Sequence, residues 1–254
     1  MKNISVEIIN QLSDNYSYLI FNNSISSCII IDPAEDEKII HILKKKKLKL
    51  EYIFITHHHS DHTSGVSGLL KEYPEAQIFS PSELCALKIK IISDEDIIKT
   101  SLNEFKVLSG PGHTLDHIML LDKKNNFLFV GDILFRLGCG RVFEGSIEQM
   151  HTSLNKILDL SDDMIVYCGH EYTLNNLKFL ENMFLKNDSL KSLKKQIIED
   201  IRSNKRSIPF ILGDEKKSNP FLNPDCEIAS ELKKNNNFSN LEVFRYLREK
   251  KDNF

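Results

Sequence analysis

The sequence predicts an α+β protein in which a region of mixed strands and helices is followed by a purely helical region. Short apolar runs bounded by turn residues, such as Tyr16–Phe21 and Cys28–Ile31, recur up to about residue 172 and are typical of buried strands. Beyond that point these runs stop, and apolar residues recur at helical spacing, as Leu193, Ile197 and Ile201 do. We therefore predict two domains, residues 1–172 and 173–254.

Each predicted element follows from the spacing of its apolar residues: a short apolar run predicts a strand, and helical spacing predicts a helix. The predicted strands are Val6–Ile9, Tyr16–Phe21, Cys28–Ile31, Tyr52–Ile55, Ala76–Ser80, Phe105–Leu108, Ile118–Leu121, Phe127–Val130 and Ile165–Cys168. The predicted helices are Asp36–Lys47, Ser64–Tyr73, Ser146–Leu158, Asn175–Phe184, Leu190–Asn204 and Ser239–Lys250. Pro209, Gly213, Pro220 and Pro224 predict an irregular connection before the last helix.

Composition excludes several classes of protein. The formal charge of −3 gives no overall attraction to nucleic acid or to an anionic membrane. No apolar run approaches the ~18 residues of a membrane span, and Met1–Ser5 passes directly into an alternating pattern without a signal peptide. The odd cysteine count, without C-x-x-C, favours a reducing compartment. We expect a cytoplasmic protein with buried cysteines; these are Cys28, Cys85, Cys139, Cys168 and Cys226.

The stretch Thr56–His62 contains four of the nine histidines of the chain. Read as H-x-H-x-D-H, it offers imidazole and carboxylate ligands of the kind that zinc, iron or manganese accept. In an extended segment His57, His59 and Asp61 face the same side, whereas His58 points away and is expected to pack or to form a supporting hydrogen bond. A solvated polar loop is the alternative for this stretch.

Three further residues of ligand type follow apolar strands and a glycine. They are His113, Asp132 and His170. Each alone has an ordinary structural interpretation, since a lone histidine is usually a satisfied polar residue and an acid after glycine can cap a turn. Three such residues at equivalent strand ends, together with the histidine stretch, indicate one site where loops carry the chemistry.

These motifs resemble the metallo-β-lactamase superfamily and, within it, the glyoxalase II enzymes, over essentially the whole chain. The histidine stretch marks the superfamily. Gly138–Arg141, Gly169–Thr173 and the basic tail Arg248–Asp252 point to glyoxalase II. The resemblance implies a four-layer αββα sandwich followed by a small helical domain that closes over the substrate.

The resemblance also implies a site with two divalent metals, with zinc expected and iron or manganese as alternatives. His57, His59 and His113 would bind the first metal, Asp61, His62 and His170 the second, and Asp132 would bridge them. A hydroxide bridging the metals would attack the carbonyl of a glutathione thioester, chiefly S-D-lactoylglutathione, and release D-lactate and glutathione. Asp61 is interpreted as a ligand and not as a base. No nucleic acid, membrane or second subunit is expected as a partner.

Four residues match substrate-binding positions of the family. Arg248 and Lys251, three residues apart on a helix, would bind the glycyl carboxylate of glutathione. Arg141 and Tyr172 lie at the substrate mouth by resemblance, although Tyr172 could instead pack. Asp116 and Phe143 depart from the family pattern.

The main alternative is a glutathione persulfide dioxygenase with one iron, which would keep only part of the ligand set. A lactonase or a general thioesterase would lack the basic tail. A nucleic-acid-processing relative would need a basic surface, and an inactive relative would have lost ligands. All seven ligand residues are present here.

Overall fold

The structure is a computed structural model that describes residues 4–84, 88–185 and 187–254. Cys85 and the first three residues, on which two of the expectations above partly rest, lie outside the described residues. The chain divides into two compact units. The first comprises residues 1–109 and 116–131, and the second comprises residues 110–115 and 132–254.

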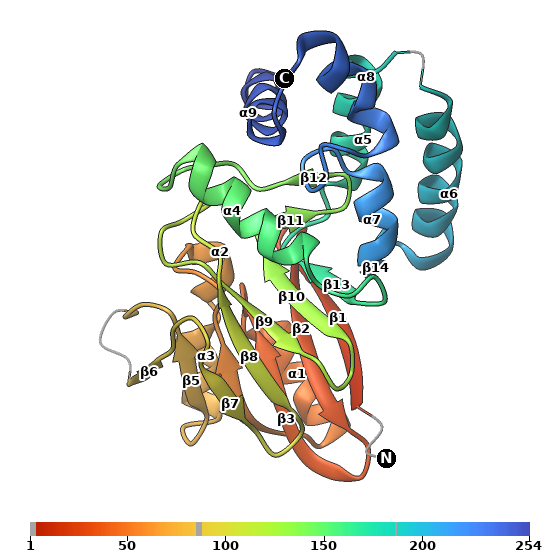
Figure 1. Ribbon diagram of the computed structural model, residues 1–254. Helices are drawn as coiled ribbons and strands as arrows, with labels where there is room; N and C mark the ends of the chain where they lie inside the picture. Colours follow the sequence, from red (N-terminus) through yellow and green to blue (C-terminus); the bar gives the residue numbers. More distant parts are fainter. Residues whose placement is uncertain (1–3, 85–87, 186) are drawn as a thin grey trace. The chain divides into compact units, whose positions relative to one another are not determined.

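A six-stranded mixed sheet forms one layer of the first unit (Figure 1). Its strands, in spatial order, are β1 (Ile4–Gln11), β2 (Asn15–Asn22), β3 (Ile25–Ile31), β4 (Lys49–Phe54), β5 (Gln77–Ser80) and β6 (Ile89–Ile91). The first three strands are antiparallel, and β3 to β6 run parallel. Parallel strands are usually covered on both faces, in agreement with the apolar sequences of β3 and β4.

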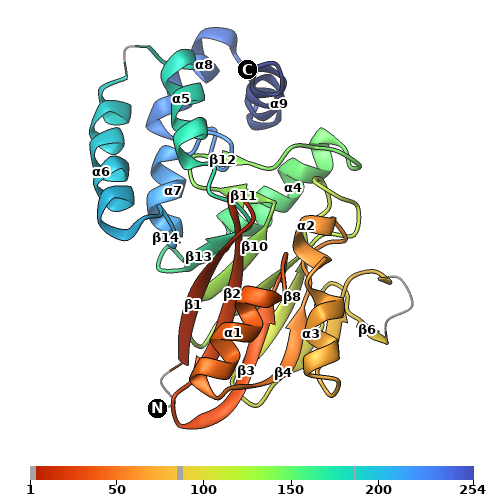
Figure 2. The same cartoon turned by 180° about the vertical axis from the view of Figure 1, so that it is seen from behind.

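Two helices cover one face of this sheet, as Figure 2 shows. They are α1 (Glu37–Lys46) and α3 (Val66–Glu72). Ile39 and Leu43 of α1 and Leu69 of α3 are buried against sheet residues such as Ile30 and Ile53. The amphipathic pattern of Asp36–Lys47 therefore reflects a real helix with one buried face.

A second, antiparallel sheet packs on the other face. It contains β7 (Ile97–Lys99), β8 (Glu104–Ser109), β9 (Ile118–Asp122) and β10 (Phe127–Gly131). Aromatic side chains fill the space between the sheets: the Phe54 and Phe105 rings lie 5.1 Å apart, and the Tyr18 and Phe129 rings 5.4 Å apart. Strand β4 ends in the loop that carries His57 and His59, so this packed core fixes the position of that loop.

The second unit is mainly helical. Its elements are β11 (Leu134–Phe135), β12 (Gly138–Cys139), α4 (Ile147–Leu158), β13 (Ile165–Cys168), α5 (Thr173–Met183), α6 (Asp188–Asn204), β14 (Phe210–Ile211), α7 (Leu212–Ser218), α8 (Glu227–Asn236) and α9 (Asn240–Asp252). The apolar residues predicted to form one face of α6 and one face of α9 contribute to the core, because Ile197, Phe244 and Leu247 are buried. The predicted boundary at residues 172 and 173 coincides with the start of α5 but stays a prediction as a domain boundary.

The helix predicted over Ser64–Tyr73 is present as α3, and a separate short helix, α2 (Ser60–Thr63), precedes it. Two predictions of local structure were wrong. The predicted irregular connection contains α7 and α8, with Pro220 and Pro224 between them. Strands also do not stop at residue 173, since β14 pairs with β13. With seven residues, α7 has too few turns for a clear periodic signal, and most residues of α8 are polar.

Within the described residues, every helix is too short or too polar to cross a membrane.

Candidate metal centre

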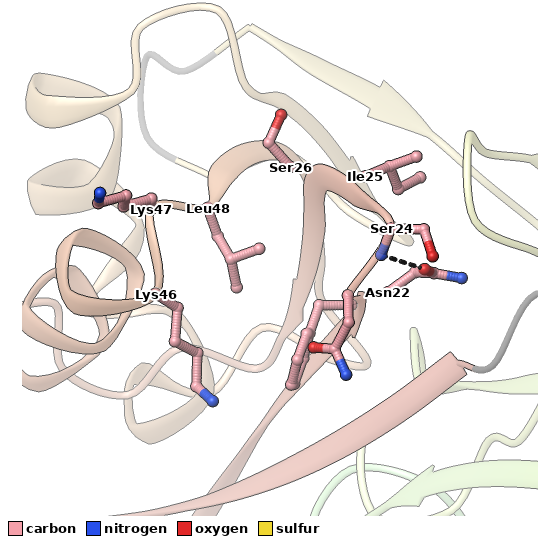
Figure 3. A pocket seen from close by; sticks show the side chains of 9 residues that line it. Asn22, Ser24, Ile25, Ser26, Lys46, Lys47 and Leu48 are labelled. Carbon is pink, nitrogen blue, oxygen red and sulfur yellow. Dashed lines mark hydrogen bonds between the residues drawn. The ribbon is translucent and has the colours of Figure 1, made fainter.

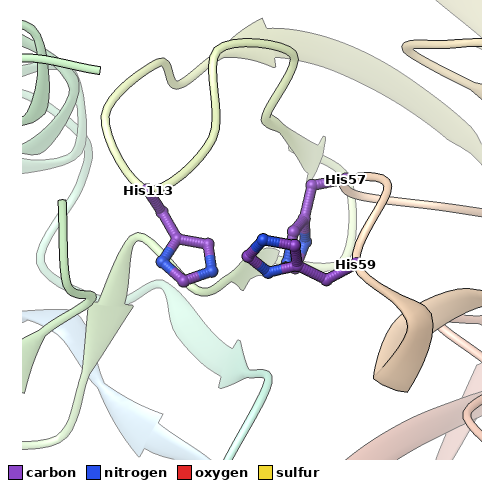
Figure 4. A group of neighbouring side chains, drawn as sticks. All are labelled: His57, His59 and His113. Carbon is purple, nitrogen blue, oxygen red and sulfur yellow. The ribbon is translucent and has the colours of Figure 1, made fainter. Parts of the chain in front are cut away.

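His57 and His59 lie on the loop that follows β4, and His113 lies on the loop that follows β8 (Figure 4). His57 is fully buried, and its Nε2 lies 3.1 Å from Nδ1 of His59. Two nitrogens bound to one zinc at about 2.0–2.1 Å lie roughly 3.0–3.5 Å apart. The two imidazoles are therefore already arranged as neighbouring ligands of one ion.

Asp61 and His62 form a second pair of candidate metal ligands in the same unit. They lie on α2, where Asp61 Oδ2 is 3.6 Å from His62 Nε2. Asn15, at the start of β2, donates to both Asp61 O and Asp61 Oδ2, over 3.1 and 2.9 Å. This contact fixes the Asp61 carboxylate beside the buried ring of His62.

Asp32, at the end of β3, determines which nitrogen of two histidines carries the proton. Its Oδ2 accepts from Thr56 Oγ1 over 2.8 Å and from His62 Nδ1 over 3.1 Å. Because Thr56 gives its proton to Asp32, its oxygen accepts from His57 Nδ1, which lies 3.0 Å away. Both rings therefore present a lone pair at Nε2, as a metal ligand must.

The extended-segment argument for the histidine stretch holds only in part. His57 and His59 precede α2, whereas Asp61 lies within it, so helical geometry and not strand alternation orients Asp61. His58 forms a supporting contact of the kind predicted, because its Nδ1 lies 2.9 Å from Asp116 Oδ1. Asp116 also accepts from Ser82 Oγ over 2.7 Å. The acid that departs from the family pattern thus forms supporting contacts with His58 and Ser82.

Three further candidate metal ligands lie close together in the second unit. Asp132 Oδ2 lies 3.5 Å from His113 Nε2 and 3.3 Å from His170 Nε2. All three side chains are at least nine-tenths buried. His113 Nδ1 donates to the carbonyl of Arg141 over 2.9 Å, which leaves the lone pair on Nε2. One carboxylate oxygen between two imidazole nitrogens is the arrangement expected of a bridging ligand.

Aromatic rings hold His170 in place. The ring of Tyr172 stacks on that of His170 at 4.7 Å and 7°, and Phe135 packs edge-on against Tyr172 at 5.0 Å. The packing interpretation of Tyr172 therefore has direct support, while its hydrogen bond to a substrate stays a prediction.

The predicted basic residues differ in burial. Arg248 is only 3% exposed and donates through Nη1 to the carbonyls of Cys139 and Gly140, over 3.1 and 3.4 Å. Lys251 Nζ lies 2.5 Å from Asn176 Oδ1. The side chain of Arg141 is 52% exposed. Arg248 and Lys251 lie on the same face of α9, as their spacing predicts, and Arg248 is not at a solvated helix end.

Sequence reasoning missed three supporting residues. These are Asn15, Asp32 and His117, whose ring stacks on that of His57 at 4.6 Å. Asp32 carries part of the signal that identified Asp132, because it is an acid at the end of an apolar strand but lacks the preceding glycine. Asn15 and His117 have no signal in the sequence, because only the fold brings them to the ligands.

A pocket of about 330 Å³ lies at the opposite end of β4, beside the run of four lysines (Figure 3). Lys46 Nζ pairs with Glu7 at 3.0 Å and lies over the Phe21 ring at 4.7 Å. Lys44 pairs with Glu72 at 2.7 Å. These lysines have acidic partners at a helix C-terminus, as a solvated helix end would.

Family models cover almost the whole chain. Residues 12–170 match the metallo-beta-lactamase superfamily, and residues 171–254 match the hydroxyacylglutathione hydrolase C-terminus. A hydroxyacylglutathione hydrolase of Pectobacterium atrosepticum is 40% identical over 96% of this chain and 97% of its own length. One of Buchnera aphidicola is also 40% identical, over 97% and 98%.

Solved structures show the same fold. ETHE1 from Myxococcus xanthus aligns with a TM-score of 0.65 over 96% of both chains, at 24% identity. At that identity the likeness concerns the fold alone. The sequence relatives are closer and span nearly their full length. The chain belongs to the metallo-β-lactamase superfamily and, within it, to the hydroxyacylglutathione hydrolases.

Proposed function

We propose that this chain hydrolyses glutathione thioesters, chiefly S-D-lactoylglutathione, to D-lactate and glutathione. The observation that carries the proposal is the position of Asp132 Oδ2 between His113 Nε2 and His170 Nε2. It is supported by the match of residues 171–254 to the C-terminal region named for hydroxyacylglutathione hydrolases and by the curated relatives of that name.

We assign seven ligands to two divalent ions. His57, His59 and His113 would hold the first ion, Asp61, His62 and His170 would hold the second, and Asp132 would be a ligand of both. The converging pairs of the first unit and the trio of the second unit support this assignment. When bound, two such ions supply a water of lowered pKa and a Lewis acid for the thioester carbonyl.

The chain's own residues orient these groups. Asp32 and Thr56 hold the imidazoles of His62 and His57 with their lone pairs inward. Asn15 donates to Asp61 Oδ2, which supports Asp61 as a ligand and not as a proton acceptor. A supporting hydrogen bond of this kind typically raises metal affinity by 10–100-fold.

The substrate has two carboxylates and one ammonium, so cationic side chains are needed to bind it. We propose Arg248 and Lys251 for the glycyl carboxylate, and Arg141 and Tyr172 for the substrate mouth. The presence of three cations within one unit supports this assignment. Phe143 is 59% exposed, and its ring lies 5.3 Å from that of His113, so it presents an apolar surface where a tyrosine hydroxyl would hydrogen-bond.

The comparisons do not favour the persulfide dioxygenase, lactonase or general thioesterase alternatives. The curated relatives are named for hydrolysis of the glutathione thioester. All the ligands of a second metal are also present, which a site with one iron does not require.

Zinc is proposed as the native metal, with iron or manganese as alternatives, because mixed nitrogen and oxygen ligands accept all three. The monomeric state and the cytoplasmic location stay predictions, to be checked by light scattering and by cell fractionation.

The decisive experiment follows the loss of thioester absorbance of S-D-lactoylglutathione with metal content measured on the same sample. Rapid hydrolysis with about two metals per chain supports the proposal. No hydrolysis by a fully metallated protein overturns it, and oxygen consumption with glutathione persulfide is then the next measurement.

A further inference from the structure

A single carboxylate oxygen in the second unit accepts hydrogen bonds from two arginines. Asp252 Oδ1, at the end of α9, accepts from Arg248 Nε over 3.1 Å and from Arg248 Nη2 over 2.8 Å. The same oxygen accepts from Arg141 Nε over 3.2 Å. Asp252 therefore links the helix that carries Arg248 to the segment that carries Arg141.

The two arginines are anchored differently. Arg248 is buried, and four of its contacts are to Cys139 O, Gly140 O and Asp252, so its guanidinium is fixed in the protein. Arg141 is half-exposed and is held by Asp252 through Nε and over the Phe143 ring at 5.7 Å. Its two Nη groups lie at the open end of a guanidinium fork, the geometry that suits a carboxylate.

Lys251 completes this group of charges. Its ammonium lies over the Phe179 ring at 5.1 Å and beside Asn176 Oδ1. Burial, followed by the positive charge of Arg248, lowers the pKa of Lys251 to about 8, while Asp252 and Cys139 raise it. Three cations thus gather around one acid. Without that acid they would repel one another at close range.

We propose that Asp252 is a positioning residue that holds Arg141 and Arg248 as one cationic cluster and thereby sets the preference for thioesters that carry a free carboxylate. The inference rests on the proposed function. In this arrangement the Asp252 carboxylate fixes the Nε side of Arg141, and the incoming carboxylate takes the Nη side. One acid offsets part of the repulsion among three cations while leaving a net positive charge for the ligand.

Replacing the Asp252 carboxylate by an amide tests this arrangement. In Asp252→Asn the side chain keeps nearly the same shape but loses its charge, so Arg141 is no longer drawn to Arg248. The pKa of Lys251 is also expected to fall, because an acid that raises it is gone. At a pH near 8, fewer molecules then carry a charged Lys251.

The experiment measures kcat and KM of the metal-loaded protein with two thioesters. One is S-D-lactoylglutathione, and the other is S-lactoyl-N-acetylcysteamine, which has the same acyl group but no carboxylate. For Asp252→Asn we expect KM for the glutathione thioester to rise roughly fivefold to tenfold, with kcat changed less than about twofold. The values of kcat/KM for the carboxylate-free thioester should stay as in the wild type.

The pH profile gives a second readout that a general loss of structure would not produce. In the wild type, KM for the glutathione thioester should rise as the pH passes the pKa of Lys251, about 8. In Asp252→Asn this rise should begin at lower pH. Asp252→Glu should restore both KM and the profile in large part, because it restores the carboxylate.

Glu148→Gln is the matched control. Glu148 also pairs with an arginine of α9, Arg245, but lies outside the cluster. This variant should leave KM unchanged for both thioesters. If Asp252→Asn keeps the wild-type KM and pH profile, or loses activity equally with both thioesters, the inference is overturned while the proposed function stands. If the wild type hydrolyses no glutathione thioester, both fall.

Discussion

Asp32 holds His62 in one tautomer, because Asp32 Oδ2 accepts from His62 Nδ1 over 3.1 Å and both side chains are buried. The same oxygen orients His57 through Thr56. We therefore expect Asp32→Asn to weaken metal binding by about 10–100-fold, measured by competition with a chromophoric chelator. Asp116→Asn, which alters the contacts of His58 and Ser82 instead, should leave the affinity near that of the wild type. Equal affinities for wild type and Asp32→Asn would exclude this role for Asp32.

Asp132→Ala should remove the carboxylate shared by two imidazoles. We expect the variant to hold less than about two metals per chain and to lose kcat by several orders of magnitude, because the water of lowered pKa depends on both ions. Metal content and kcat should be measured on the same preparation. A variant with two bound metals and near-normal kcat would show that Asp132 has no bridging role.

Lys251→Ala and Arg248→Ala should separate substrate binding from packing. Both are expected to raise KM, because we propose that the two residues contact a part of the substrate remote from the thioester. Arg248→Ala should also lower the free energy of unfolding by about 2–4 kcal/mol, because two buried carbonyls, Cys139 O and Gly140 O, lose a donor. Denaturant unfolding checks this difference. An equal loss of stability in both variants would contradict the structural role assigned to Arg248.

Glu215 makes stability depend on pH. Burial raises the pKa of this carboxyl to about 7, against the hydrogen bond from Leu137 N, which lowers it. The folded state therefore holds a proton that the unfolded state releases at lower pH, so stability falls as pH rises from the unfolded pKa of about 4.5 toward 7 and is then level.

In Glu215→Gln this contribution to the slope should be absent. Thermal unfolding of both proteins over that range measures it, and the difference between their curves removes the effect of the metal-ligand histidines. Parallel curves for the two proteins would show that Glu215 keeps its ordinary pKa.

Much of the fold could be predicted from local pattern. The strands Tyr16–Phe21 and Phe127–Val130 and the helix Asp36–Lys47 have strong periodicity, and each is found within one or two residues. Helix α7 was missed because it has only seven residues, and α8 was missed because most of its ten residues are polar and give a weak apolar pattern. Their positions depend on tertiary contacts, such as the buried Glu215 of α7, which local periodicity does not encode.

The ligands could be named because their residue types are scarce and their sequence positions equivalent. Asn15 and His117 could not, because their role depends on strands β2 and β9 bringing them beside Asp61 and His57. The buried state of Arg248 was also beyond the sequence, since a basic residue near a helix end is usually solvated. Only its carbonyl partners on another segment explain its burial.

Beside the pairing of β11 with β12, several backbone groups of this hairpin have partners far along the chain. Asn219 donates to Phe135 O and Gly138 O, Glu215 accepts from Leu137 N, and Asn176 donates to Arg136 O. During synthesis on the ribosome, this segment leaves the exit tunnel well before residues 215–219 are made. The turn between β11 and β12 therefore stays hydrated, without its final partners, until the later helices emerge. The order of translation thus delays the completion of the segment that carries Arg141.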